Sequence, residues 1–276
     1  MYKTLLVPVD GRPRSARSID VACRLAATFN AHVVGLFVKP LSDLPSALFA
    51  EGNATPLVEY QERRLRELTT AAKSQFDAGV KAAGNVSNEW RVADGDPADA
   101  VWLHARYADL VIINQTDPHA EDATHFADSV LLSLSRPALL VPYAGELKSL
   151  GRRALIAWNA SRESARAVTD ALPLLQRAER VRVLTIDGRP SAEGHGESPG
   201  ADTALFLARH GVKAEAEQTV SGGVDVGNVI LSRAADEAAD LIVMGAYSHT
   251  RAREIVLGGA TRTILSSMTV PVLMSH

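Results

Sequence analysis

The chain has 276 residues, which suits one large domain or two of ordinary size. Apolar residues make up 46% and charged residues 22% of it, a balance that excludes a disordered chain, and the formal net charge of −3 excludes nucleic-acid binding through bulk electrostatics. No apolar run reaches the roughly 20 residues that span a membrane, and the run at the N-terminus is too short for a signal peptide. Cys23 has no second cysteine to pair with, so we expect a reducing compartment and a cytoplasmic protein. We expect Cys23 itself to lie buried in the first helix as a small hydrophobic residue.

Short β-branched runs alternate with longer helical patterns along the chain, which is typical of a parallel α/β fold. In the first half we expect strands at 4–9, 32–38, 86–92, 109–114 and 137–142. We expect helices between them at 14–29, 54–84, 96–106 and 123–135. In the second half we expect strands at 153–158, 180–187, 213–220, 240–244 and 270–275. The strands are mainly apolar, which favours a sheet covered on both faces.

The two halves are copies of one unit. Residues 5–17 (LLVPVDGRPRSAR) align with residues 154–166 (ALIAWNASRESAR), so that Asp10 corresponds to Asn159. Two further matches follow in the same order: 108–111 (ADLV) with 239–242 (ADLI), and 137–139 (PAL) with 271–273 (PVL). Ordered matches of this kind indicate a duplication.

We therefore expect two tandem doubly wound five-stranded parallel-sheet α/β domains, at residues 1–146 and 152–276. The second helix is long in the first copy and shrinks to 200–211 (GADTALFLARHG) in the second. Open sheets of this type bind ligands beyond the carboxyl ends of their strands, where the strand order reverses.

A glycine-rich segment lies after the fourth strand of the second copy. Gly245-Ala246-Tyr247-Ser248 is followed by Gly258-Gly259-Ala260-Thr261 at the start of a helix. Glycines allow close approach of the backbone, and the N–H groups at a helix start attract phosphate. The alternative is that these glycines only end a strand and cap a helix.

The duplication, the first strand ending in Asp or Asn, and the spaced glycines together resemble the universal stress protein family, over nearly the whole chain. The resemblance implies an adenine nucleotide alpha hydrolase-like fold, with ATP or another adenine nucleotide bound by the second copy. The ATP-binding motif of that family is G-x2-G-x9-G-[Ser/Thr]. Gly245 and Gly258 keep its first and third places, whereas Ser248 and Gly259 depart from the second and fourth.

The resemblance implies these nucleotide-binding residues: Asn159, Ile186, Met244, Gly245, Ser248, Gly258, Gly259, Ala260 and Thr261. By the same resemblance the amides of 258–260 face the phosphates and residues 244–245 the ribose. We expect Thr261 or Ser248 to supply the missing hydroxyl. The resemblance also implies that Asn159 meets the adenine and that Ile186 lines the base. An equal alternative for Asn159 is a turn or a helix N-cap.

The first copy lacks these features. No glycine occurs between Asp96 and Ala144, and its corresponding loop carries acidic residues that repel phosphate: Asp117, Glu121, Asp122 and Asp128. Asp10 alone remains of the site. We expect this copy to act as a packing partner in an intrachain pseudo-dimer, joined through strands 137–142 and 270–275, and a further homodimer stays open.

Two competing signals are weaker. Ser221-Gly222-Gly223-Val224-Asp225 resembles the loop of ATP-pyrophosphatase (PP-loop) enzymes. It follows a third strand and has Val226 at the last hydroxyl position, so a turn entering a helix is favoured. His119 and His125 lie among acids, yet their spacing matches no zinc pattern, so we expect no metal.

The sequence thus favours an ATP-binding regulatory protein of the stress response, non-enzymatic or at most a slow ATPase. The alternatives are a nucleotide-free stress protein that acts through protein partners and, less favoured, a PP-loop adenylating enzyme. We identify no catalytic residue, and we expect no nucleic-acid or membrane partner.

Overall fold

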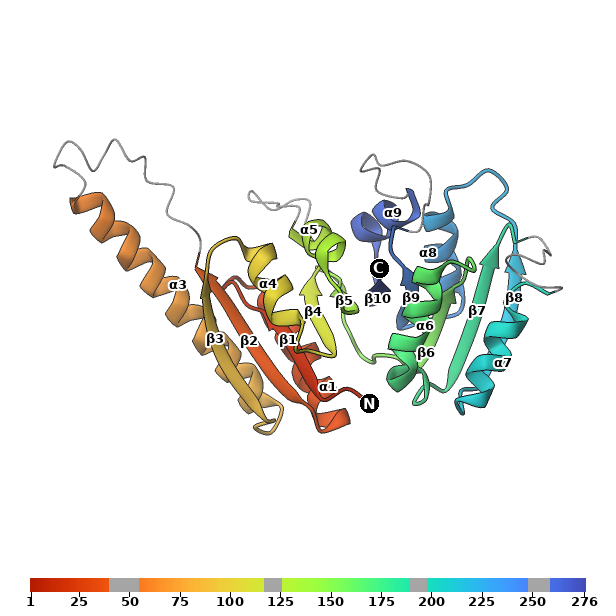
Figure 1. Cartoon of the computed structure of the whole chain (residues 1–276), viewed down its shortest axis with the longest axis horizontal. Helices are drawn as coiled ribbons and strands as arrows, with labels where there is room; N and C mark the ends of the chain where they lie inside the picture. Colours follow the sequence, from red (N-terminus) through yellow and green to blue (C-terminus); the bar gives the residue numbers. More distant parts are fainter. Residues whose placement is uncertain (40–54, 117–125, 189–197, 248–258) are drawn as a thin grey trace. The chain divides into compact units, whose positions relative to one another are not determined.

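The computed structural model describes residues 1–39, 55–116, 126–188, 198–247 and 259–276 (Figure 1). The chain divides into two compact units, Tyr2–Ile112 and Ile113–His276, and Met1 belongs to the second.

The first unit is a parallel sheet with helices on both faces. Its strands are β1 (Thr4–Pro8), β2 (His32–Lys39), β3 (Asn88–Asp94) and β4 (Leu110–Asn114), whose last two residues lie in the second unit. Their order is β3-β2-β1-β4, and all pairs are parallel. The helices are α1 (Ser15–Phe29), α3 (Thr55–Ala82) and α4 (Pro97–Ala105). Helices α1 and α3 pack against each other on one face, and α4 covers the other (Figure 1).

Helix α1 forms where the sequence places small and apolar side chains three and four residues apart, and Ile19, Cys23 and Ala26 on this face are buried. Cys23 is buried, as expected. Burial, with the nearby charge of Asp20, raises the pKa of its thiol to about 11, so the thiol stays protonated and packs as a small apolar group.

The second unit contains the last elements of the first copy and all of the second copy. Its strands are β5 (Ala138–Val141), β6 (Arg153–Ala157), β7 (Arg180–Ile186), β8 (Ala214–Thr219), β9 (Leu241–Gly245) and β10 (Val272–Ser275). Its helices are α5 (Phe126–Ser133), α6 (Arg162–Leu175), α7 (Ala201–Arg209), α8 (Val226–Asp236) and α9 (Gly259–Ser267). The strand order is β5-β10-β9-β6-β7-β8.

The second copy is therefore a complete doubly wound sheet, β10-β9-β6-β7-β8, with every neighbouring pair parallel. The chain leaves β6 toward β7 on one side and returns to β9 on the other. The carboxyl ends of β6 and β9 thus lie next to each other at the point where the strand order reverses, which is where this type of sheet binds ligands.

The last strands of the two copies pair with each other, as expected. β5 and β10 run antiparallel, with Leu139 opposite Leu273 and Leu140 opposite Val272. All four of these side chains are fully buried. Because each strand supplies the other's missing neighbour, neither presents an open edge.

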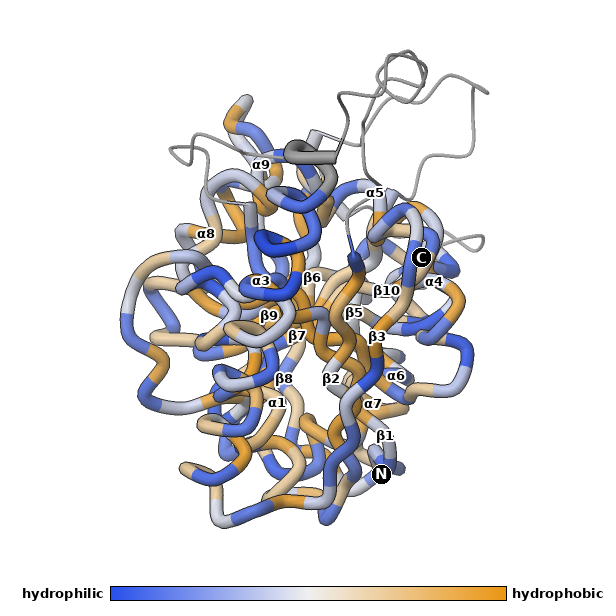
Figure 2. Tube along the Cα trace, turned by 90° about the vertical axis from the view of Figure 1, so that its left-hand side faces the viewer, coloured by the Kyte–Doolittle hydropathy of each residue, from blue (hydrophilic) through white to orange (hydrophobic). Residues whose placement is uncertain are grey.

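The central strands match the expected apolar pattern, whereas the outermost strands do not. Hydrophobic residues concentrate along the strands, as the colouring of the trace by hydropathy shows (Figure 2). Leu241, Ile242 and Val243 of β9 are fully buried. Strands β3 and β8 are mostly half-buried or exposed. On β8, Glu215 and Glu217 form ion pairs with Arg182 of β7. The expectation of mainly apolar strands is therefore wrong for β3 and β8.

Candidate functional site

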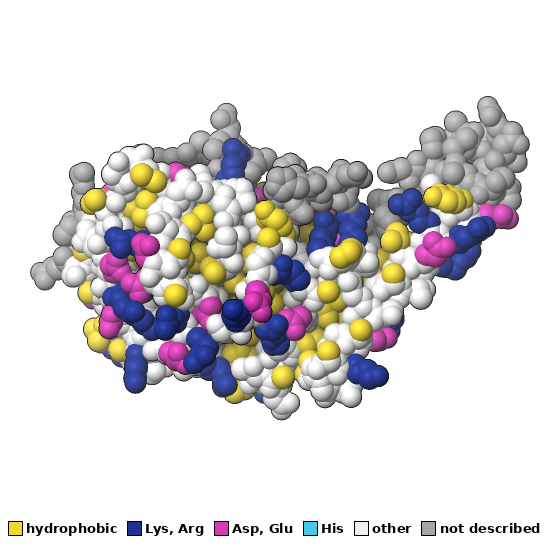
Figure 3. Space-filling view, turned by 180° about the vertical axis from the view of Figure 1, so that it is seen from behind, with side chains coloured by type: hydrophobic (Ala, Val, Ile, Leu, Met, Phe, Trp, Pro, Cys, Tyr) yellow, Lys and Arg dark blue, Asp and Glu magenta, His cyan; other side chains and the backbone are white. Residues whose placement is uncertain are grey.

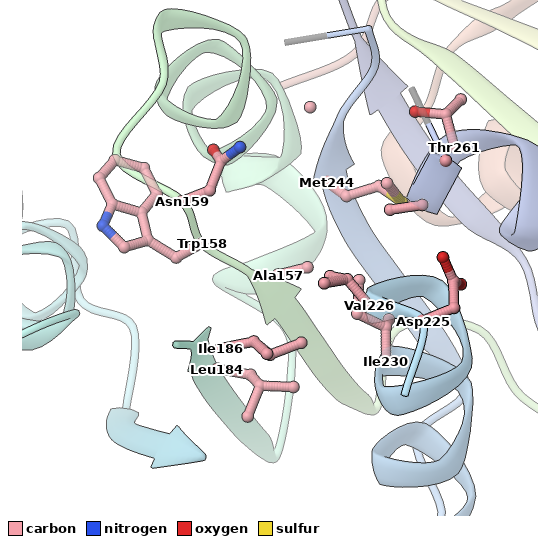
Figure 4. A pocket seen from close by; sticks show the side chains of 13 residues that line it. Ala157, Trp158, Asn159, Leu184, Ile186, Asp225, Val226, Ile230, Met244 and Thr261 are labelled. Carbon is pink, nitrogen blue, oxygen red and sulfur yellow. The ribbon is translucent and has the colours of Figure 1, made fainter. Parts of the chain in front are cut away.

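A pocket of about 420 Å³ lies where the carboxyl ends of β6 and β9 meet the start of α9. That volume is within the range of small-molecule sites, roughly 300–1,000 Å³. Its lining is Ala157, Trp158, Asn159, Leu184, Ile186, Asp225, Val226, Ile230, Met244, Gly245, Gly259, Ala260 and Thr261 (Figure 4).

The pocket gathers most of the residues singled out from the sequence. Those that line it are Asn159, Ile186, Met244, Gly245, Gly259, Ala260 and Thr261. They come from four separate segments, so the fold and not chain proximity brings them together. Ser248 and Gly258 lie outside the described residues.

One wall of the pocket is apolar. Leu184 and Ile186 reach it from the end of β7, and Val226 and Ile230 from the first turns of α8 (Figure 4). Met244, which is 5% exposed, faces the same space from β9. A surface of this kind suits a flat apolar face of a ligand, because contact removes apolar area on both sides from water.

The opposite end of the pocket is polar. Helix α9 begins at Gly259, so its first N–H groups have no partner within the helix and carry the positive end of the helix dipole. Thr261, in the same turn, is 4% exposed, and its Oγ1 accepts a hydrogen bond of 3.4 Å from the N–H of Tyr247. This N–H is presented by a backbone in the left-handed region, with φ 59° at Tyr247.

Gly245 is required by packing. A Cβ at this position would lie 2.6 Å from the N of Ser164 and 2.7 Å from the carbonyl carbon of Glu163, at the start of α6. Backbone atoms of a helix cannot yield to such a contact. The glycine therefore lets α6 approach the end of β9, a role that the sequence pattern alone does not reveal.

Asn159 takes part in the turn between β6 and α6. Its Oδ1 accepts hydrogen bonds from the N–H of Ser161 at 3.2 Å and from the Ser161 hydroxyl at 2.7 Å. The Oγ of Ser161 in turn accepts from the N–H of Ser164 and caps α6. The turn function considered for Asn159 is thus present, and its contact with a base stays a prediction.

Asp225 was not predicted as a site residue, yet it lines the pocket beside α9. Its Oδ1 accepts a hydrogen bond of 3.2 Å from the N–H of Asn228 and caps α8. Its Oδ2 lies 3.6 Å from where a Cβ on Gly259 would be. The sequence signal was the Ser-Gly-Gly-Val-Asp segment, whose glycines adopt φ 59° and 86° in a turn entering α8. The interpretation of this segment as a helix-entry turn is confirmed.

In the first copy, Asp10 corresponds to Asn159 and forms hydrogen bonds within its own loop. Asp10 accepts hydrogen bonds from the N–H of Arg12, from the guanidinium of Arg14 and from the hydroxyl of Ser15. Burial alone would raise the pKa of Asp10, but these hydrogen bonds and the charge of Arg14 outweigh it and hold the pKa below its usual value. The next residue, Gly11, packs against the backbone of α3: a Cβ there would lie 3.1 Å from the carbonyl oxygen of Leu68.

Within the described parts of the chain, no three His, Cys, Asp or Glu side chains are grouped so that they could hold a metal ion. His119, His125 and the acids beside them lie outside those parts. Among the described helices, none has the length and apolar character needed to cross a membrane.

Comparison with known proteins gives the family. The model of the universal stress protein family matches residues 1–142 and again residues 151–276. No curated protein sequence matches the chain.

Solved structures share the fold. A universal stress protein from Archaeoglobus fulgidus DSM 4304 is 15% identical, with 99% of this chain and 97% of that one covered and a TM-score of 0.75. A protein of unknown function from Pseudomonas aeruginosa PAO1 is 14% identical, with 99% and 92% covered and a TM-score of 0.60. A universal stress protein in complex with cAMP is 23% identical, with 52% and 98% covered, but its TM-score of 0.36 carries nothing about this chain's ligand. Because the family model matches both halves of the sequence, the chain belongs to the universal stress protein family and carries two of its domains in tandem.

Proposed function

We propose that this chain is a regulatory protein of the stress response that binds an adenine nucleotide, ATP or a close relative, in its second copy. The observation that supports this most is the pocket of about 420 Å³, in which an apolar wall faces a helix N-terminus. A nucleotide has the same division between a flat base and an anionic tail.

The pocket suggests an orientation for the nucleotide. We place the base against Ile186 and the other apolar side chains of β7 and α8, with Asn159 at its edge. The ribose then lies near Met244 and Gly245. The phosphates point to the N–H groups of Gly259, Ala260 and Thr261, where the dipole of α9 favours negative charge.

We expect binding rather than rapid turnover. Asp225 is the titratable side chain in the described lining, and one of its oxygens is occupied in capping α8. A general base for water must reach the attacking molecule with a suitable pKa, and no second group among the described lining residues offers this role. Hydrolysis of ATP, if it occurs, is therefore slow.

The proposal is tested by mass spectrometry of small molecules released from the denatured protein, followed by calorimetric titration with ATP. The matched variants are Val226→Trp and Val220→Trp. Val226 is 39% exposed and lines the pocket, whereas Val220 is 74% exposed and does not. We expect the indole at 226 to fill the pocket and abolish ATP binding, with the 220 variant binding as the wild type does.

Two results contradict the proposal. If the wild type carries no adenine nucleotide and binds none in titration, the chain acts without nucleotide, through protein partners. If Val226→Trp binds ATP as well as the wild type, the nucleotide lies elsewhere.

A further inference from the structure

We propose that the outward face of helix α4 joins two molecules of this chain into a symmetric dimer. This surface, named the α4 face, consists of Asp99, Trp102, Leu103, Arg106 and Tyr107, from the helix and the turn after it. It belongs to the first copy and contains no residue of the pocket lining, so the inference is independent of the proposed nucleotide site.

The α4 face is largely apolar and exposed. Its positions are three and four residues apart, which places them on one side of the helix, whereas Val101 and Ala105 on the other side are buried against the sheet. The exposed fractions are 37% for Trp102, 49% for Leu103 and 75% for Tyr107. Figure 1 shows α4 on the face of the sheet opposite α1 and α3. Large apolar side chains gathered on one exposed surface are typical of a protein–protein contact.

The fold itself does not require an apolar surface at this place. Helix α8 is the equivalent of α4 in the second copy, since each follows a third strand and begins after an aspartate N-cap, Asp96 or Asp225. Apart from Val226 at the pocket, the exposed residues of α8 are Asn228, Ser232, Ala235 and Asp236. These side chains are small or polar. The large apolar side chains of the α4 face therefore serve a contact outside their own fold.

The side chains of the α4 face suit an interface. The guanidinium of Arg106 stacks on the ring of Trp102, with its central carbon 3.9 Å from the ring centroid. Stacking uses the flat face of a guanidinium, whereas its N–H groups donate along its edges, so the same group can also meet a carboxylate. Trp, Tyr and Arg are the residue types that contribute most to binding at protein interfaces.

The order of charges on the α4 face indicates that the partner is a second molecule of the same chain. Asp99 lies three residues before Trp102, and Arg106 lies three residues after Leu103, so the pattern is symmetric about the point between Trp102 and Leu103. In an antiparallel pair of α4 helices, with a two-fold axis passing between them at this point, Asp99 of each molecule lies opposite Arg106 of the other. Trp102 and Leu103 then meet their own counterparts at the axis. A two-fold contact requires a self-complementary surface, and this order of acid, apolar pair and base provides one.

The expected dimer is weak, because the contact is small. A face of about two helical turns is smaller than the roughly 800 Å² that each partner buries in a standard stable interface. We expect a dissociation constant of about 10–100 µM, in the range of transient association. Sedimentation equilibrium of the full chain between about 5 and 500 µM measures a constant of this size.

The first test places a charge at the centre of the contact. In Leu103→Glu two carboxylates face each other beside the axis, so we expect dimerisation at least about tenfold weaker than in the wild type. Leu205→Glu is the matched control: Leu205 lies on α7 in the second copy and is 50% exposed, close to the 49% of Leu103. This variant dimerises as the wild type does.

The second test examines the antiparallel arrangement. Asp99→Arg makes both flanking positions basic, and Arg106→Asp makes both acidic, so each variant alone should dimerise about tenfold more weakly than the wild type. In an equimolar mixture, each arginine of one variant faces an aspartate of the other. We therefore expect the mixture to associate within about threefold of the wild type, as measured by sedimentation with one variant fluorescently labelled. Recovery in the mixture also shows that both variants are folded.

Three results overturn the inference. A wild type that stays monomeric over the whole concentration range has no such contact. A dimer that Leu103→Glu leaves intact forms through another surface. If the mixture of Asp99→Arg and Arg106→Asp associates no better than either variant alone, the helices do not pair about the proposed two-fold axis.

Discussion

Two glycines of the pocket differ in what surrounds their α-carbons. A Cβ on Gly245 would enter the backbone of α6, whereas a Cβ on Gly259 would lie 3.6 Å from Asp225 Oδ2, an ordinary contact distance. Neither glycine has the positive φ that would forbid a side chain for conformational reasons. The space around the Cβ position therefore determines whether Gly245 and Gly259 can be replaced by a residue with a side chain.

We expect Gly245→Ala to destabilise the protein by about 1–3 kcal/mol, because β9 and α6 must separate to admit the methyl group. Gly259→Ala, the control, is expected to leave stability unchanged or raise it by up to about 1 kcal/mol, since alanine favours a helix more than glycine does. The free energy of unfolding in urea measures both. Equal effects of the two substitutions would refute the packing argument for Gly245.

Asp10 gives the first copy a pH-dependent contribution to stability. Its pKa in the folded protein is lowered from the usual 3.8, although burial opposes the shift, because Ser15 and Arg14 stabilise the charged form. A carboxyl group whose pKa is lowered by folding stabilises the fold above its unfolded pKa. That contribution is lost as the pH falls through the folded pKa.

Asp10→Asn should therefore destabilise the protein at pH 7, and the difference from the wild type should shrink as the pH drops below about 4. Urea unfolding at a series of pH values between neutral and acid measures this. If the difference in the free energy of unfolding stays constant over that range, the charge of Asp10 does not contribute to stability.

At the level of elements, the apolar runs of the sequence predicted the central strands, because a buried strand needs continuous apolar residues whatever its partners are. The positions of the exposed strands β3 and β8 were harder to predict. The strand expected at 86–92 is observed at Asn88–Asp94, since the chain leaves α3 through left-handed residues at Gly84 and Asn85 and pairs later with β2. β8 forms although it is polar, because Arg182 pairs with its glutamates.

The same distinction holds for the pocket. Residues next to the expected strand ends, such as Asn159 and Met244, could be predicted because parallel strands bring their carboxyl ends to one edge of the sheet. Asp225 could not, since its place depends on how α8 packs beside α9. An N-cap aspartate reveals where a helix begins, but nothing in its local sequence reveals which ligand surface the helix faces.

At the scale of the whole molecule, charges of both signs are mixed over the described residues of one face (Figure 3). Lys and Arg side chains are interspersed with Asp and Glu on the face seen in Figure 3, in keeping with a net charge of −3. The asymmetry between the copies lies at their strand ends. The second copy has a pocket at these strand ends. In the first copy, Asp10 is hydrogen-bonded within its own loop and Gly11 packs against α3.

In the first copy the residue that follows β4, Gln115, uses its side chain for structural hydrogen bonds. Its Nε2 donates to the carbonyl oxygen of Leu265 in α9 at 2.9 Å, and its Oε1 accepts from the N–H of Tyr143 at 3.1 Å. Ala246 holds the corresponding place after β9, and its methyl side chain cannot form hydrogen bonds. The two copies have thus kept the same strand order, while positions that stabilise the first copy correspond to positions at the proposed nucleotide site of the second.

These differences predict one nucleotide per chain. In calorimetric titration with ATP and Mg²⁺ we expect a stoichiometry of one for the wild type. We expect no binding by Val226→Trp, because the indole fills the pocket of the second copy and we expect the first copy to bind no nucleotide. Arg14→Ala removes the shorter of the two ion pairs of Asp10 and leaves the one with Arg12. We expect the stoichiometry to stay at one, since α3 still packs on Gly11. A stoichiometry of two in the wild type, or residual binding in Val226→Trp, would mean that the first copy retains a site of its own.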